Sequence, residues 1–356
     1  MRVGIVGALI GLAVFGAMLL EADGDPFVIV AVAEDSAIGD RIETEIGRTV
    51  IARPNPGHDG QFFLLQAVDP LVADPFTVEY MWPTRYRGQR MFYPLVVGVG
   101  GLVPMVAIPW TMAVLQILSY GLGAGAVGEL AARRGLTRWW GLAFVLNPGM
   151  WGSLQIGGAS TMALALCFAA VLQHDRGRYL WAGVIFALSL LTRETMVLML
   201  AGVMFEDLIR YRTVRLQMFA LAVVPSAAWA VFLRLQVPDA TGDTNGALGL
   251  PFNGFPEAVE VWQRSFDGLL FGVMTTVSAF VLLWRAVVAR DVLISACAPF
   301  AALFLLLTPS VLRMSFDYSR AVAPVYVGVV IVIAFALRDA ATARQSLEAE
   351  PQAAPV

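Results

Sequence analysis

A succession of apolar segments, each close to the length of a membrane-crossing helix, dominates the chain, and short arginine-bearing loops join them. A chain that crosses a bilayer must satisfy its backbone hydrogen bonds internally, which a helix of this length does. The composition agrees, because 58% of the residues are hydrophobic and 14% are charged, against about 25% charged residues in a typical soluble domain. The sequence therefore predicts an all-α polytopic membrane protein.

The apolar segments predict a bundle of about ten transmembrane helices with both termini on one side of the membrane. Residues 1–20 form the first; their apolar run of about 18 residues exceeds the stretch of about 7 to 15 found in signal peptides. The other expected spans are residues 110–129, 139–155, 159–173, 179–191, 195–208, 216–235, 267–288, 292–307 and 321–337. The tail, residues 338–356, is rich in Ala, Glu and Pro and is expected to be a disordered cytoplasmic segment.

Residues 21–109 are expected to form a large extracytoplasmic loop ahead of the helical bundle, which occupies 110–337. Two β-branched stretches, residues 27–33 and 49–52, predict a small β-hairpin. From Gln61 onward apolar residues recur at helical spacing, which predicts a short helix lying in the membrane interface. Residues 92–108 contain several glycines and prolines, so they are expected to be interfacial or re-entrant rather than to cross.

The placement of arginine predicts the orientation, because short loops rich in basic residues stay in the cytoplasm. With the loop of Arg133 and Arg134 in the cytoplasm, most arginines beyond the first loop fall on that side. The remaining ones, on the outer side, are Arg193, Arg234, Arg264, Arg313 and Arg320. The expected location is the plasma (inner) membrane, in contact with membrane lipids and with the first loop outside.

Charge and cysteine usage argue against several other classes of protein. The 24 basic residues are all arginine and the net charge is -3, so no polybasic surface for nucleic acid is expected. Cys167 and Cys297 are isolated within apolar segments, which is neither a disulfide framework nor a metal-binding spacing. The two histidines, His58 and His174, are not paired at a zinc-binding spacing.

Asp59 is the first candidate for chemistry, because it stands between Gly57 and Gly60 in a polar loop just ahead of an aromatic run. One interpretation is structural, since an Asp at the start of a helix caps it by accepting a backbone N–H hydrogen bond. The other is a general base that takes a proton from an acceptor hydroxyl. His58 would then tune the base or bind substrate.

Arginines on the outer side are the second group of candidates. Arg193 and Glu194 interrupt two apolar runs, and charges at membrane depth are by default functional; the alternative is that both side chains reach out to water. Guanidinium groups match phosphate oxygens and offset the charge of a leaving phosphate. Arg313 and Arg320 lie beside Tyr318 and are candidates for the same task, as are Arg87 and Arg90, which alternatively anchor an interfacial helix to lipid headgroups.

Several motifs resemble the GT-C superfamily of membrane glycosyltransferases, in particular bacterial cell-surface glycopolymer transferases and relatives of the GPI mannosyltransferases. The likeness covers roughly residues 56–195. The residues that carry it are Gly57-His58-Asp59-Gly60-Gln61-Phe62-Phe63, Asp69-Pro70, the Tyr86 to Pro94 stretch, Leu146-Asn147-Pro148 and Leu191-Thr192-Arg193-Glu194-Thr195. A later "R-x-x-x-P" stands as Arg320 to Pro324.

The resemblance implies that Asp59 is the catalytic base and that a polyprenyl-phosphate-linked sugar is the donor. The residues that it suggests for substrate binding, together with the outer arginines, are His58, Gln61, Arg87, Arg90, Arg193, Glu194, Arg313, Tyr318 and Arg320. Two departures matter: His58 replaces a tyrosine, and the second outer loop, residues 155–160, lacks an acid that many relatives carry. The missing acid weakens the case for a bound divalent cation, so no cofactor is firmly expected.

The expected function is therefore inverting transfer of a sugar from a polyprenyl-phosphate donor to an extracytoplasmic glycan, lipid or protein acceptor of the cell envelope. A transporter or flippase for a lipid-linked or anionic solute is the main alternative, with the outer arginines as its binding site. A scaffold subunit that kept the fold without the activity is a third interpretation. In both alternatives Asp59 is dispensable.

Overall fold

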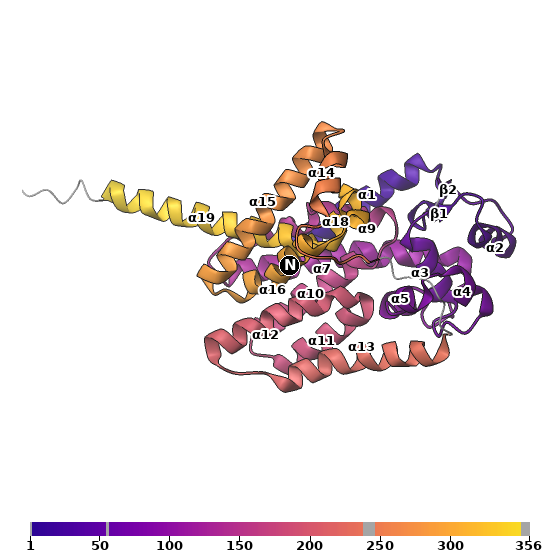
Figure 1. Ribbon diagram of the computed structural model, residues 1–356, viewed down its shortest axis with the longest axis horizontal. Helices are drawn as coiled ribbons and strands as arrows, with labels where there is room; N and C mark the ends of the chain where they lie inside the picture. Colours follow the sequence, from indigo (N-terminus) through magenta and orange to yellow (C-terminus); the bar gives the residue numbers. More distant parts are fainter. Residues whose placement is uncertain (1, 55–56, 238–245, 350–356) are drawn as a thin grey trace, which may run out of the picture.

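The computed structural model describes residues 2–54, 57–237 and 246–349. Within them the chain is mainly helical, as the apolar segments predict. The short elements of the first loop gather at one end of the molecule, and the last helix, α19, extends beyond the other helices at the opposite end (Figure 1).

Five helices are long and apolar enough to cross a membrane among the described residues. They are α1 (Arg2–Glu21), α7 (Ile108–Ala132, entered through the short 3-10 helix η2, Met105–Ala107), α13 (Leu216–Gln236), α15 (Phe266–Ala289) and α19 (Ala323–Ala349). The apolar windows of α1, α13 and α15 are less than one-third buried. Apolar surface that the protein leaves uncovered on this scale suits contact with lipid.

Shorter helices complete the bundle. They are η3 (Arg138–Gly141), α8 (Leu142–Val145), α9 (Pro148–Gln155), α10 (Ser160–Asp175), α11 (Tyr179–Thr192), η4 (Glu194–Met196), α12 (Val197–Tyr211), α14 (Phe255–Trp262), α16 (Val292–Leu306), α17 (Pro309–Leu312) and α18 (Ser315–Ala321). α7 packs between α1 and α10, α11 packs between α10 and α13, and α16 packs against α12, α15 and α19. The expected span 139–155 is thus realised as the three short helices η3, α8 and α9, because Pro148 starts a new helix capped by Asn147. The expected span 159–173 is realised as the single helix α10.

The first loop holds several short elements. They are η1 (Pro26–Ile29), β1 (Val32–Ala33), α2 (Ala37–Ile46), β2 (Ala52–Arg53), α3 (Asp59–Val68), α4 (Pro75–Tyr80), α5 (Thr84–Gly88) and α6 (Phe92–Val97). The predicted β-hairpin is wrong, because β1 and β2 pair in parallel. Helix α2 lies between them in the chain and supplies the crossover that parallel pairing requires.

Helix α3 is where the sequence predicts a helix, but it is not a surface helix. Seven of its ten residues are buried, including Leu64 and Leu65, and it packs against α6 and α7. The segment 92–108 contains the short helices α6 and η2, and its last residues lead directly into α7, with which η2 forms one candidate membrane span. That residues 92–104 are interfacial or re-entrant stays a prediction.

The tail, residues 338–356, is expected from its composition to be disordered, but its described part is helical. α19 continues without a break to Ala349, since Ala, Glu, Leu, Gln and Arg all favour a helix and extension from an existing helix needs no new nucleus. The remainder of the expected disordered segment, residues 350–356, lies outside the described residues, as do residues 55–56 of the first loop.

Candidate functional site

Asp59 is the first residue of α3, and the two neighbouring glycines fix where that helix starts. Gly57 has φ +66°, a conformation that costs glycine little. A Cβ on Gly60 would lie 2.5 Å from the carbonyl oxygens of both Val30 and Ile156. The start of α3 is therefore held tightly between η1 and the loop that precedes α10.

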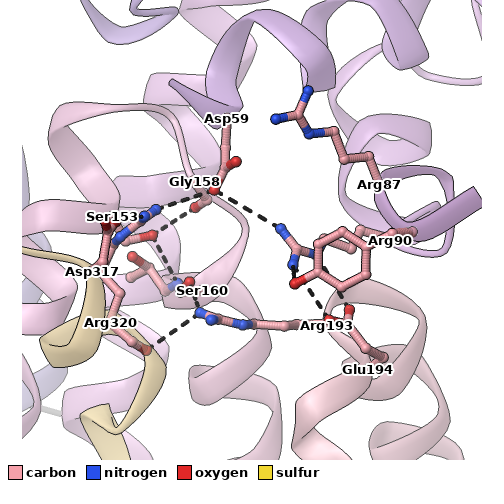
Figure 2. A network of polar contacts seen from close by, with 12 residues as sticks. Asp59, Arg87, Arg90, Ser153, Gly158, Ser160, Arg193, Glu194, Asp317 and Arg320 are labelled. Carbon is pink, nitrogen blue, oxygen red and sulfur yellow. Dashed lines mark hydrogen bonds and ion pairs between the residues drawn. The ribbon is translucent and has the colours of Figure 1, made fainter. Parts of the chain in front are cut away.

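The carboxylate of Asp59 faces arginines that come from distant parts of the chain (Figure 2). Its Oδ2 accepts a hydrogen bond from Arg320 Nη1 at 3.1 Å and lies 3.9 Å from Arg90 Nη1. The side chain keeps 30% of its surface exposed. The N-cap of α3 is His58, which makes no side-chain capping bond, so helix capping does not explain the acid.

Arg90 links Asp59 to Glu194 and is almost fully buried, with 8% of its side chain exposed. Its Nε lies 3.2 Å from Glu194 Oε2, and its Nη2 donates to the Tyr86 hydroxyl at 2.6 Å. A buried charge must be paired and hydrogen-bonded to be tolerated. Arg90 and Glu194 meet that requirement for one another. The closest cationic partner of the Asp59 carboxylate is therefore Arg320, with Arg90 farther away.

Arg193 lies below Asp59 in the same cluster (Figure 2). Its Nη1 donates to the Ser160 hydroxyl and to the main-chain oxygen of Arg320 at 3.3 Å, while its buried Nε has no hydrogen-bond partner. Arg320 itself bridges two acids, because its Nη2 also donates to Asp317 Oδ1 at 2.8 Å. Arg193 is thus held by neutral oxygens, unlike Arg320 and Arg90.

Arg87 is the fourth arginine around Asp59. Its Nη1 donates to the Trp82 carbonyl at 2.6 Å, and its guanidinium stacks 3.4 Å from the centre of the Phe62 ring. Among the residues that the structure describes, neither Arg87 nor Arg193 forms an ion pair with a carboxylate. The cluster therefore offers two guanidinium groups whose charge is not already neutralised by direct contact.

The arginines control the ionisation of Asp59. Burial alone would raise the pKa of this carboxyl, but the surrounding guanidinium groups, Arg320 first and Arg90 second, outweigh that effect and hold the pKa well below its usual range. Burial, followed by the charge of Arg320, lowers the pKa of His58, so its ring is neutral at pH 7. Burial lowers the pKa of Arg87 to about 10, so this arginine remains cationic.

Two cavities adjoin the cluster. Asp59, Arg87 and Arg90 line a void that is too small for a water molecule, so any ligand between them requires these side chains to move. A second pocket of about 390 Å³ is lined by Trp151 and Phe316, among others. The ring of Phe316 lies 4.8 Å from the Arg320 guanidinium and therefore connects this pocket to the cluster.

Three of the residues singled out in the sequence lie outside the cluster. Arg313 is exposed and pairs with Glu257 at the surface. Tyr318 is fully buried, its ring 5.6 Å from that of Trp262. The buried Gln61 accepts a hydrogen bond from the backbone N–H of Ala33 at 3.2 Å, so it supports the start of α3. Sequence proximity groups Arg313 and Tyr318 with Arg320, but the structure separates them. Arg313 ends α17, before the break at Met314, and Tyr318, although on α18 with Arg320, packs into the core.

His58, Arg87, Arg90, Arg193, Glu194 and Arg320, by contrast, do gather around Asp59. Sequence reasoning missed three partners: Tyr86, Ser160 and Asp317. In the sequence, Tyr86 resembles one more interfacial aromatic residue, and Ser160 ends an uncharged stretch that predicts a loop, although in the structure it begins α10. The spacing of Asp317 and Arg320, three residues apart on one helix, was the only signal for a contact.

No group of three or more His, Cys, Asp or Glu side chains that could hold a metal ion occurs in the described parts of the chain. Comparisons with protein-family models, curated proteins and solved structures find no match to this chain. The feature that points to a function is therefore the cluster itself, in which Asp59 is surrounded by four arginines.

Proposed function

We propose that the protein is an integral membrane glycosyltransferase of the GT-C type. It transfers a sugar from a polyprenyl-phosphate donor to an acceptor on the extracytoplasmic face of the plasma membrane, with inversion at the anomeric carbon. About ten membrane segments, several of them shorter than a full span, would enclose the site. Both termini would be cytoplasmic, in keeping with the distribution of arginine.

One observation supports the proposal most: arginines from separate stretches of the sequence, each predicted to bind substrate, converge on Asp59. Arg90, Arg193 and Arg320 come from the first loop, the end of α11 and α18, and all approach one partly exposed carboxylate. A structural acid needs only one partner. An acid set among several cations, two of them without an ion pair, suits a site for an anionic substrate.

The reaction assigns a separate task to each group. The acceptor hydroxyl attacks the anomeric carbon while Asp59 takes the hydroxyl proton. The bond from that carbon to the phosphate oxygen breaks, and the polyprenyl phosphate leaves with the electron pair. Arg193 and Arg87, whose charges are not neutralised by direct contact, stabilise the leaving phosphate. Asp59 then releases its proton to water.

The contact between Arg320 and Asp59 has a consequence for this mechanism. In the absence of substrate the arginines make the carboxylate a weak base. A donor phosphate bound among the guanidinium groups would offset their charge and draw Arg320 away from Asp59, so that the basicity of the carboxylate rises. The site would thus be activated by the substrate that it uses.

Substituting Asp59→Asn tests the proposal. The change keeps the size of the side chain, and Asp59 makes no capping bond, so insertion into the membrane is expected to be normal. Loss of the base is expected to lower transfer by about 10²- to 10⁴-fold. The measurement is transfer of a radiolabelled sugar from membrane-extracted polyprenyl-phosphate donors by purified protein.

Glu257→Gln is the matched control, because it also removes one ion-paired carboxylate but lies at the surface beside Arg313. Its transfer rate is expected to stay close to that of the unmodified chain. Full activity of Asp59→Asn at equal protein amount would remove Asp59 as the base. Uptake of the lipid-linked sugar into vesicles without any transfer would instead favour the transporter.

A further inference from the structure

A second polar cavity lies at the opposite end of the helices that carry the Asp59 site. Ser160 and Arg193 mark one end of α10 and α11, whereas His174 and Tyr179 mark the other. Helix α10 has 16 residues, which corresponds to about 24 Å at 1.5 Å per residue. The two sites are therefore separate, and nothing in the proposed reaction uses the second one.

Three ionisable side chains are buried in this second region. Asp207, Glu206 and His174 are exposed by 1%, 4% and 7% respectively. Asp207 Oδ2 lies 2.9 Å from His174 Nε2 and accepts from Arg215 Nε at 3.2 Å. Glu206 Oε2 accepts from the Ser295 hydroxyl at 2.9 Å. No cation contacts Glu206 among the described residues.

Each of these three side chains also keeps one atom without a hydrogen-bond partner. The atoms are Asp207 Oδ1, Glu206 Oε1 and His174 Nδ1. An unmatched buried polar atom costs about 1–3 kcal/mol, and more when the group is charged. All three residues line one cavity of about 450 Å³. The three atoms themselves are buried, so a group bound in that cavity would satisfy them once these side chains turn toward it.

Four arginines line the same cavity: Arg133, Arg134, Arg210 and Arg215. Arg133 and Arg134 are already paired with Asp175, whereas Arg210 donates only to a main-chain oxygen in the described chain. Arg215 stacks 3.4 Å from the centre of the Tyr179 ring. The cavity thus combines two acids, each with one oxygen that lacks a donor, with arginines suited to an anion.

A mainly apolar pocket of about 600 Å³ adjoins the polar cavity. The two share Gly177, Tyr179 and Arg215. The apolar pocket is lined by Leu180 and Trp181 from α11 and by Leu216 from α13. All three side chains are more than half exposed, and aromatic and basic residues at helix ends mark the headgroup level of a bilayer.

We propose that these two pockets bind one phospholipid whose headgroup carries a primary ammonium group. The ammonium would donate to the free oxygens of Asp207 and Glu206. The phosphate would lie against Arg210 and Arg215, and an acyl chain would follow Trp181 and Leu216. The geometry points to this occupant because one ligand then matches three features of the pockets. Its ammonium supplies donors for the free carboxylate oxygens, its phosphate an anion for the arginines, and its acyl chain a partner for the apolar lining.

The number of hydrogen atoms on the headgroup nitrogen distinguishes this ligand from its nearest relatives. A quaternary choline headgroup is cationic but has no N–H to donate. A glycerol headgroup donates hydrogen bonds but lacks the positive charge that buried carboxylates require. Phosphatidylethanolamine meets both requirements.

Native mass spectrometry of the full chain in detergent tests the proposal, with equal amounts of phosphatidylethanolamine, phosphatidylcholine and phosphatidylglycerol of the same acyl chains. Phosphatidylethanolamine is expected to be retained about tenfold more than either competitor, as a charge-assisted hydrogen bond allows. Glu206→Gln and Asp207→Asn, which keep the side-chain shapes, are expected to abolish that preference.

Glu257→Gln serves as the matched carboxylate variant and is expected to keep the preference, as is Asp59→Asn, because both lie apart from the cavity. Equal retention of the three lipids by the unmodified chain would overturn the proposal without the need for any variant. Unchanged preference in folded Glu206→Gln and Asp207→Asn would overturn it as well. Neither result depends on whether the protein transfers a sugar.

Discussion

At the scale of single residues, the central feature is a carboxylate whose ionisation depends on its neighbours. Arg320 contributes most to the low pKa of Asp59 and also binds Asp317. A general base works best when its pKa lies near the working pH. The resting cluster is therefore built to hold Asp59 ionised rather than to make it strongly basic.

The pH dependence of transfer follows from this arrangement. Because the pKa of Asp59 in the free protein is lowered, the carboxylate stays ionised as the pH falls, and kcat/KM is expected to be flat from pH 7 to about 5. Arg320→Gln removes the positive charge that lowers the pKa of Asp59 most. The pKa of Asp59 therefore rises, and the fall of kcat/KM on the acid side of the pH–rate profile moves to higher pH. Measured pH–rate profiles of both proteins check this.

Arg313→Gln is the control for that measurement, since Arg313 is exposed and pairs with Glu257 away from the cluster. Its profile is expected to match that of the unmodified chain. If kcat/KM of Arg320→Gln falls at the same acid pH as that of the unmodified chain, the charge of Arg320 does not set the pKa of Asp59.

At the scale of secondary-structure elements, α3 positions the acid because its start is enclosed by other backbone. Gly60 approaches the carbonyl oxygens of Val30 and Ile156 more closely than any side chain would allow. The sequence predicts the helix from its periodicity and the turn from its glycines. Its burial against α6 and α7 could not be predicted, because the same period suits an interfacial helix and a packed one.

Gly60→Ala is expected to force α3 away from η1 and from the loop before α10. The clash with main-chain atoms resembles overpacking of a core, which costs about 1–3 kcal/mol, and it also displaces Asp59 from Arg320. Lower thermal stability in detergent, together with reduced transfer, is the expected result. Tryptophan fluorescence during heating and the transfer assay measure the two effects.

Gly16→Ala in α1 is the comparison, because a Cβ at Gly16 meets nothing within 4 Å. It is expected to change neither stability nor transfer, and an alanine there favours the helix slightly. Equal behaviour of the two variants would show that the close approach at Gly60 does not restrain α3.

At the scale of the whole molecule, arginine placement predicts which ends of the helices share a side. Residue 176, at the far end of α10, and residue 257, beside Arg313, are expected on opposite sides. Both native cysteines are buried, so single introduced cysteines can be followed. Arg176→Cys is expected to react with a membrane-impermeant maleimide only after permeabilisation, whereas Glu257→Cys reacts in intact cells. Labelling of both from outside would contradict the proposed orientation.

Much of this architecture is predictable from the sequence, because apolar length and loop arginines are local signals. The helical class, the long apolar helix α1 and the position of α3 follow from such signals. The parallel pairing of β1 with β2 and the helical tail depend on neighbours and on helix extension. The meeting of Arg193 with Ser160 depends on how α10 and α11 pack, and that of Arg90 with Glu194 depends on how the first loop lies against the end of α11.

The candidate site draws on residues from nearly the whole length of the chain, and that fact sets an order on its formation during synthesis. When the first loop has been made, Asp59 has only Arg87 and Arg90 as cationic neighbours; Arg193 arrives after α11, and Arg320 after α18. A nascent or truncated chain that ends before α18 therefore lacks the strongest partner of its acid. The site is thus complete only once the chain has been made as far as α18, with only α19 of the described helices still to follow.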